Sequence, residues 1–231
     1  MSPDLGERLA AIRDRVAAAA RRSGREPAAI TTIVVTKFQP VELVRELREL
    51  GVTDFGENRH QEAREKAALV PDVHWHFVGQ LQGKKARQVR AYASVIHSID
   101  RVSLVDTLDS PGESADSSAA PPTVDVFAQV NLTDDPGRGG AAPADLPALV
   151  ERIEAAPGLR LLGVMAVAPL GEEPRAAFAR LRGIADEVRR IAPGATRISA
   201  GMSADFEDAI AEGATHLRIG TAITGSRPDR A

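Results

Sequence analysis

Lys37 ends a run of β-branched residues, TTIVVTK, where an ammonium group is out of place in a protein core. If the run is a buried strand, the amine lies at the carboxyl end of that strand, where α/β barrels gather their functional residues. A lysine that is partly desolvated, or placed near another cation, has a lowered pKa and becomes a better nucleophile toward aldehydes. We therefore hypothesise Schiff-base chemistry at Lys37. The alternative is an ordinary exposed lysine just beyond a strand.

A second candidate site is the motif RIGTAITG near the end of the chain, where small residues follow another strand. Their backbone N–H groups are accessible to an anion, and Thr221 adds a hydroxyl. In the preceding loop Ser199 and Ser203 flank Gly201, and SADFEDAI then opens a helix whose N-terminal N–H groups favour anions. The loops after the seventh and eighth strands of barrels frequently bind phosphate. An amine facing a phosphate site indicates a phosphorylated aldehyde, and pyridoxal 5'-phosphate is the obvious candidate.

The other polar motifs have simpler interpretations. Asn58, in FGEN, is suited to cap the helix that it opens. His74 and His76 share one face of a strand, because side chains alternate along a strand. Such a pair can bind a metal ion, but no third ligand is apparent, so we expect a structural role. The motif LQGKKARQ is typical of a solvated basic face.

Alternating strands and helices must position these residues. Apolar patterning predicts strands at residues 31–37, 52–57, 73–79, 94–100, 123–132, 159–169 and 215–225, and a strand followed by a turn within residues 195–203. Helical patterns lie between them, and Leu5, Leu9, Ile12 and Val16 form an extra amphipathic N-terminal helix that ends near Ser23. Eight such units favour a single (β/α)8 TIM-type barrel. An open doubly wound sheet stays possible, but the first strand ends in TKFQP, without the glycine fingerprint typical of that fold.

Composition narrows the function classes. We expect one barrel domain over all 231 residues, with SPGESADSSAAPP, residues 110–122, as a flexible loop. A net charge of -3 and an aromatic content of 3% do not favour nucleic-acid binding. The absence of cysteine excludes disulfides and thiolate sites and fits a reducing cytoplasm. We find neither a signal-peptide core nor a membrane-spanning window, and we therefore expect a cytoplasmic protein.

Seven motifs, in chain order, carry a resemblance to a known family: VTKFQP, FGENRHQEAREK, WHFVGQLQGKK, IHSID, GVMAVAP, SAGMSADFEDAI and GATHLRIGTAITGSR. Together they resemble the pyridoxal-phosphate homeostasis family, which is similar to the barrel domain of alanine racemase. The match runs from the N-terminal helix to Gly225. It implies an alanine-racemase-like barrel without that enzyme's second, β-rich domain, for which we expect no room after residue 227.

The resemblance implies roles for individual residues. Lys37 would carry pyridoxal 5'-phosphate (PLP) as a Schiff base, Arg218 would face the pyridine nitrogen, and Asn58 would line the ring side of the site. The residues implied around the phosphate are Ser199, Ser203, Gly220 and Thr221.

Arg218 decides how reactive such a site is. A permanently charged guanidinium cannot accept the proton of the pyridine nitrogen, so the ring is expected to stay unprotonated and to stabilise carbanions weakly. Racemisation in alanine racemase also needs a tyrosine base. Tyr92, the only tyrosine of this chain, lies in a helical pattern far from the rim motifs.

The resemblance therefore implies a PLP-binding regulator rather than an enzyme, acting in intracellular PLP homeostasis and delivery. Its partners would be PLP and apo-PLP enzymes, with no nucleic acid and no membrane. We expect a monomer, because no long exposed apolar stripe demands a second copy. The alternatives are a low-activity PLP-dependent amino-acid racemase, a lysine-dependent aldolase-type barrel without a cofactor, and a non-catalytic scaffold.

Overall fold

The protein is a closed barrel of eight parallel strands that pair in chain order, as a computed structural model describing residues 4–110 and 123–226 shows. This confirms the predicted barrel and excludes the open sheet. All but the first residue of the predicted 110–122 loop lie outside the described residues. The strands are β1 Thr31–Val35, β2 Asp54–Glu57, β3 His74–Phe77, β4 Val95–Ile99, β5 Val124–Gln129, β6 Leu159–Met165, β7 Arg197–Ser199 and β8 His216–Ile219.

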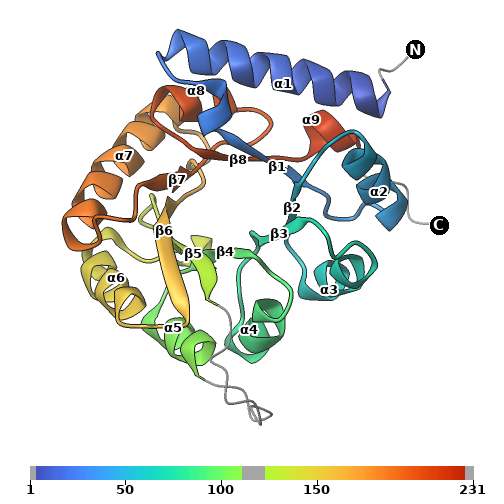
Figure 1. Ribbon diagram of the computed structural model, residues 1–231. Coiled ribbons are helices and arrows are strands. Elements are labelled where there is room, and N and C mark those ends of the chain that lie inside the picture. The colour runs from blue at the N-terminus through green and yellow to red at the C-terminus, as the bar shows by residue number, and fades with distance from the viewer. Residues whose placement is uncertain (1–3, 111–122, 227–231) are drawn as a thin grey trace.

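Helices surround the barrel, as Figure 1 shows. They are α1 Leu5–Arg22, α2 Val41–Glu49, α3 His60–Leu69, α4 Gly83–Arg90, α5 Val102–Asp109, α6 Leu146–Glu154, α7 Pro174–Ile191, α8 Phe206–Ala211 and α9 Thr221–Thr224. The extra N-terminal helix α1 lies across α8 and α9 on the outside of the barrel (Figure 1). Among the described residues, no helix is both long and apolar enough to cross a membrane.

Local sequence explains both ends of the chain. In α1, the Asp4 side chain accepts from the Glu7 N–H at 2.7 Å, and the Glu7 carboxylate accepts from the Asp4 N–H at 3.2 Å, which completes a capping box.

The predicted last strand, residues 215–225, is too long. Strand β8 ends at Ile219, and Thr221–Thr224 form the short helix α9. The small residues that follow β8 therefore begin a turn at the barrel mouth.

Imidazole and phenyl rings fill part of the barrel lumen. His97 stacks on Phe127 with ring centroids 4.6 Å apart, and Phe127 meets His216 edge-on at 5.1 Å. Burial lowers the pKa of His97 well below its ordinary value. Burial, with smaller contributions from His76 and Arg197, lowers the pKa of His216 to about 4. His97 and His216 are therefore neutral at pH 7.

A buried ion pair joins the ends of β1 and β2 to helix α3. Lys66 Nζ donates to Glu57 Oε1 at 2.6 Å and to the Thr36 carbonyl at 2.7 Å. The Thr36 hydroxyl donates to the same Glu57 oxygen at 2.7 Å. Burial raises the pKa of Glu57, while Lys66 and Thr36 oppose that rise by stabilising the carboxylate. The Lys66 ammonium thus holds the backbone directly before Lys37.

We predict that Lys66→Met lowers the free energy of unfolding by about 3–5 kcal/mol, because the variant leaves Glu57 buried without its cation. The double variant Lys66→Met/Glu57→Leu should regain most of this loss, since an apolar pair of similar volume carries no unpaired charge. Urea unfolding followed by circular dichroism measures both values. A double variant as unstable as the single one would contradict the assignment of the loss to an unpaired carboxylate.

We also predict that stability falls as the pH is lowered from about 6.5 toward 5. The pKa values of His97 and His216 are depressed in the folded state, so the unfolded chain takes up protons in this window while the folded chain does not. Each of these histidines contributes a slope of about 1.4 kcal/mol per pH unit. The variant His216→Phe should remove about one proton from that slope, measured by urea unfolding at several pH values. An unchanged slope would show that His216 is protonated in the folded protein.

Candidate functional site

Lys37 lies on the loop directly after β1, at the carboxyl-terminal mouth of the barrel, and its side chain is exposed. Phe38, the next residue, has φ 66°, an uncommon backbone conformation for a bulky residue. Its N–H donates to Glu62 Oε2 on α3 at 2.9 Å, and the Arg59 guanidinium lies 5.0 Å from the centre of the Phe38 ring. The Lys37 amine has no hydrogen-bond or ion-pair partner within residues 4–110 and 123–226. A tethered loop therefore presents an uncommitted amine at the mouth.

Ser203 and Thr221, both expected around a phosphate, meet on the same rim. Their hydroxyl oxygens are 3.5 Å apart, and the Ala222 N–H donates to Ser203 Oγ at 3.3 Å. Gly220 lies against the end of β1, since a Cβ added there would be 3.4 Å from the Val35 carbonyl oxygen. Strands β1 and β8 are neighbours in the barrel. The structure thus brings Ser203, Gly220 and Thr221 together beside the strand that leads to Lys37; we call these three residues the hydroxyl cup.

Arg218 is buried in the barrel beneath this mouth. Its Nη1 donates to Ser199 Oγ at 2.6 Å and its Nη2 to the Ala166 carbonyl at 2.9 Å. The side chain is 6% exposed, and burial lowers the pKa of Arg218 to about 10 against an opposing effect of Asp205, so the guanidinium is charged at pH 7. Ser199 is fully buried, and its hydroxyl also lies 2.9 Å from His97 Nδ1. Ser199 is therefore engaged with Arg218 and not with the hydroxyl cup.

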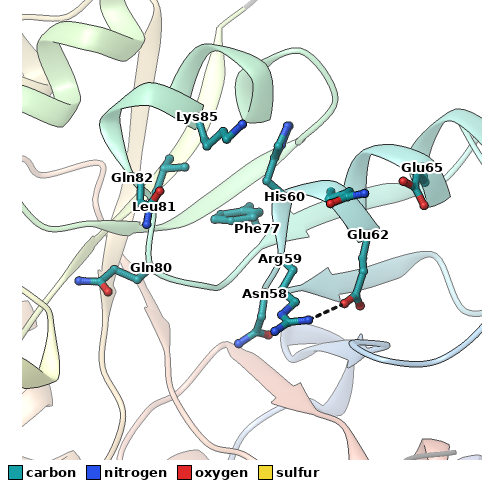
Figure 2. Close-up of a pocket in the computed structure, with 11 residues that line it drawn as sticks. Asn58, Arg59, His60, Glu62, Glu65, Phe77, Gln80, Leu81, Gln82 and Lys85 are labelled. Carbon is teal, nitrogen blue, oxygen red and sulfur yellow. Dashed lines mark hydrogen bonds and ion pairs between the residues drawn. The ribbon is translucent and has the colours of Figure 1, made fainter. Parts of the chain in front are cut away.

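A pocket of about 500 Å³ opens beside Asn58, between the first residues of α3 and α4 (Figure 2). His60 and Lys85 stand on opposite sides of this pocket, with Phe77 between them. Asn58 is the one residue of the predicted site that lines it, and its Oδ1 is buried without a hydrogen-bond partner in the described chain. The Asn58 backbone passes so close to Gly79 that a Cβ there would overlap the Asn58 carbonyl. This contact fixes where Asn58 enters the mouth.

The histidine pair on β3 belongs to the lower part of the barrel. His76 Nε2 lies 3.0 Å and His74 Nδ1 3.4 Å from Asp54 Oδ1. Within the part of the chain that the structure describes, no three metal-ligating side chains come together. The geometry agrees with a structural role for both histidines.

Sequence analysis did not single out Asp54, which contacts His76, or Lys66, which contacts Thr36 and Glu57. Lys66 falls in a polar helix pattern, RHQEAREKAAL, in which every charged residue has the pattern of an exposed one. Asp54 opens a strand, where the alternation of side chains gives its face but not its partner. The signal that could have found Asp54 is its β3 neighbour, the alternating HWH motif, because adjacent strands bring polar residues of one face together.

Comparisons with known proteins agree with this architecture. The family model described as "Alanine racemase, N-terminal domain" matches residues 8–228. A pyridoxal phosphate homeostasis protein of Pseudomonas aeruginosa is 40% identical over 228 residues, which cover 96% of each chain. The protein of the same name from Escherichia coli is 37% identical over 232 residues, which cover 97% of each chain.

Solved structures show the same relationship. PipY of Synechococcus elongatus, solved with PLP bound, is 35% identical with a TM-score of 0.82, covering 96% of this chain and all of that one. Alanine racemase of Corynebacterium glutamicum has a TM-score of 0.72 at 14% identity, over 95% of this chain and 62% of the enzyme, which shows a shared fold. The chain therefore belongs to the pyridoxal phosphate homeostasis protein family, within the group defined by the N-terminal domain of alanine racemase.

Proposed function

We propose that this protein binds pyridoxal 5'-phosphate at the barrel mouth and serves intracellular PLP homeostasis, holding the aldehyde reversibly and delivering it to apo-PLP enzymes. The observation that carries this proposal is the position of the unpaired Lys37 amine, on the loop directly after the strand that adjoins the hydroxyl cup. The relatives support it, because full-length matches at 37–40% identity have the name of PLP homeostasis proteins and PipY was solved with PLP.

The chemistry of the donor set fits this ligand. PLP carries an aldehyde, a phosphate and a pyridine nitrogen, and the mouth offers an amine, two hydroxyls and a guanidinium in separate places. The Ser203 and Thr221 hydroxyls are suited to a phosphate, since hydrogen bonds to charged oxygens are among the stronger ones. The buried, unpaired Oδ1 of Asn58 is a polar atom that a ligand can satisfy. A fully apolar or fully acidic mouth would not suit this ligand.

Lys37 provides the covalent attachment. Its amine nitrogen bonds to the aldehyde carbon, the aldehyde oxygen leaves as water, and the resulting Schiff base is hydrolysed by the reverse reaction. Because the Lys37 side chain is exposed, water and an incoming amine can reach this bond. That accessibility suits reversible storage and transfer.

Arg218 keeps the site from being a strong electron sink. Its charged guanidinium would face the pyridine nitrogen and disfavour protonation there, as the resemblance implies. Ser199, expected around the phosphate, has its hydroxyl engaged by Arg218 and His97, so we propose that it orients Arg218. The phosphate is then left to Ser203, Gly220 and Thr221.

The same geometry argues against a racemase. Tyr92 is the only tyrosine, and its hydroxyl lies 3.4 Å from His60 Nδ1 next to helix α4, away from Lys37. Burial, followed by the charge of Glu57, raises the pKa of Tyr92, so its phenol stays protonated at neutral pH and is not available as a base. The relatives are named as homeostasis proteins, and we propose that this chain likewise has no steady racemase turnover. Steady conversion of single amino-acid enantiomers, abolished by Lys37→Ala, would favour the racemase alternative.

We predict that borohydride reduction of the protein after incubation with PLP places a pyridoxyl adduct on Lys37, located by peptide mass mapping of residues 36–39. Lys37→Ala should lose both the adduct and the near-visible absorption band, because no other amine occupies that position. Lys84→Ala, which removes an exposed lysine of α4, is the matched control and should keep both. A colourless wild-type protein, or an adduct confined to another lysine, would refute the proposal.

We predict that Ser203→Ala combined with Thr221→Val weakens PLP retention about 10- to 100-fold, because two hydrogen bonds to a charged phosphate are lost. Titration of the near-visible band with PLP measures the dissociation constant. Thr107→Val on α5 also removes a hydroxyl but lies outside the mouth, and its affinity should match the wild type. Equal affinities in all three proteins would place the phosphate elsewhere.

A further inference from the structure

A continuous line of hydrogen bonds crosses the barrel lumen from Arg218 to Asp54. Arg218 Nη1 lies 2.6 Å from Ser199 Oγ, which lies 2.9 Å from His97 Nδ1. His97 Nε2 lies 2.9 Å from His76 Nδ1, and His76 Nε2 lies 3.0 Å from Asp54 Oδ1. The line runs from β8 through β7, β4 and β3 to β2, so it joins strands on opposite sides of the barrel. We call these five residues the lumen relay.

When both imidazoles are neutral, the Asp54 carboxylate fixes the direction of every bond in the lumen relay, and this direction matches the Arg218 end. A guanidinium only donates and a carboxylate only accepts. Asp54 therefore accepts from Nε2–H of His76, whose Nδ1 accepts from Nε2–H of His97. Nδ1 of His97 then accepts from the Ser199 hydroxyl, which leaves the Ser199 oxygen to accept from Arg218. With both histidines neutral and protonated on Nε2, every donor in the line meets one acceptor.

The Asp54 end of the lumen relay is the more exposed end, and the middle of the line is buried. Ser199 and His97 are fully buried, His76 is 3% exposed, and the Asp54 side chain is 20% exposed beneath the barrel. Asp54 also accepts from the Thr53 hydroxyl at 2.7 Å. Burial alone would raise the pKa of Asp54, but hydrogen bonds from His76 and Thr53 and the nearby imidazoles lower it to about 2. The carboxylate is thus a permanent acceptor at the lower end.

Other charged and titratable groups face the lumen relay from neighbouring elements. His216 on β8 and Arg197 on β7 lie near the imidazoles, His74 on β3 lies beside Asp54, and Asp205 before α8 acts on Arg218. His216 pairs with Ser199 through the backbone of the β7–β8 ladder, but among the described residues no side-chain hydrogen bond joins any of these groups to Ser199 Oγ or to Nε2 of His97. They affect the charge of the lumen, but they do not replace a bond of the line.

We propose that Asp54, His76, His97 and Ser199 are positioning residues for Arg218: the Asp54 carboxylate sets the direction of the line, which turns the Ser199 oxygen toward the guanidinium and fixes its orientation toward the cofactor ring. This inference rests on the proposed function for the role of Arg218, while the direction of the line is a property of the protein itself. A hydroxyl that was free to rotate could present its hydrogen to Arg218, and the buried guanidinium would then lose an acceptor.

Nitrogen-15 NMR of the histidine rings tests the direction of the line in the full chain, both as purified and after saturation with PLP. At pH 7 we expect His76 and His97 as neutral rings with a proton on Nε2 and none on Nδ1. A doubly protonated ring, or a proton on Nδ1 of either residue, would reverse a bond and overturn the proposal. This measurement needs neither a variant nor bound cofactor, so it stands even if PLP binding fails.

A second measurement tests the effect on Arg218. The pH midpoint of the near-visible absorption of the PLP-loaded protein is compared between wild type, His97→Phe and Asp54→Ala. If Arg218 loses its orientation, the pyridine nitrogen is relieved of a positive neighbour, and the midpoint should rise by about half a pH unit or more, a threefold change in proton affinity. Asp54→Asn keeps an acceptor for His76 and should restore the wild-type midpoint.

The matched control is His216→Phe, which removes a half-buried imidazole from the same lumen but breaks no bond of the line. A general loss of packing would shift both histidine variants alike, whereas the proposal expects a shift in His97→Phe only. Equal midpoints in wild type, His97→Phe and Asp54→Ala, with PLP still reduced onto Lys37, would overturn the proposal and leave the proposed function intact. Absence of a Lys37 adduct in the wild type would instead reject the proposed function.

Discussion

The buried guanidinium of Arg218 is the constraint around which the barrel interior is organised. A charge removed from water is costly unless its hydrogen bonds are satisfied. No carboxylate touches this guanidinium among the described residues; a serine hydroxyl and a backbone carbonyl do. The acceptor hydroxyl must in turn be held, which accounts for imidazole rings in a lumen that most barrels fill with aliphatic side chains. One cation thus determines the polarity of residues on five strands.

On the neighbouring strand β1 the requirement is reversed, because the proposed function needs the Lys37 amine to be available, whereas the Lys66 ammonium is buried. The Lys66 ammonium donates to Glu57 and to the Thr36 carbonyl, while Lys37 is exposed on a loop that Glu62 holds through the Phe38 N–H. Two lysines near the end of β1 therefore differ in the availability of their amines, because Lys66 is buried and Lys37 is exposed. The left-handed backbone at Phe38 costs about 1–3 kcal/mol, and such strain commonly marks functional loops.

Much of this architecture could be predicted from the sequence, and the limits have physical causes. Alternating apolar runs and helical patterns specify the eight-stranded barrel, because each pattern depends on residues close in the chain. The ends of strands were harder to predict from the sequence. The small residues after Ile219 were expected to continue the last strand, although they form a turn and α9. Lys37 and Thr221 could be proposed for the site because each lies just after a strand, and Ser203 because it lies in the loop that follows β7.

Contacts between distant strands could not be predicted in the same way. Whether Ser199 faces the phosphate or Arg218 depends on His97, which lies 102 residues away across the lumen. A single sequence carries no direct record of such a pairing. The burial of Lys66 likewise depends on how α3 packs against β2, and helical periodicity alone does not give that.

A hydrogen bond links α1, near the start of the described chain, to α9, which begins at Thr221 of the hydroxyl cup. Arg8 Nε on α1 donates to the Ile223 carbonyl on α9 at 2.7 Å, across 215 positions of sequence. Contacts of such separation are entropically costly and form slowly. We therefore infer that the hydroxyl cup is completed late in folding, because α9, which begins at Thr221, gains this contact only after α1 docks.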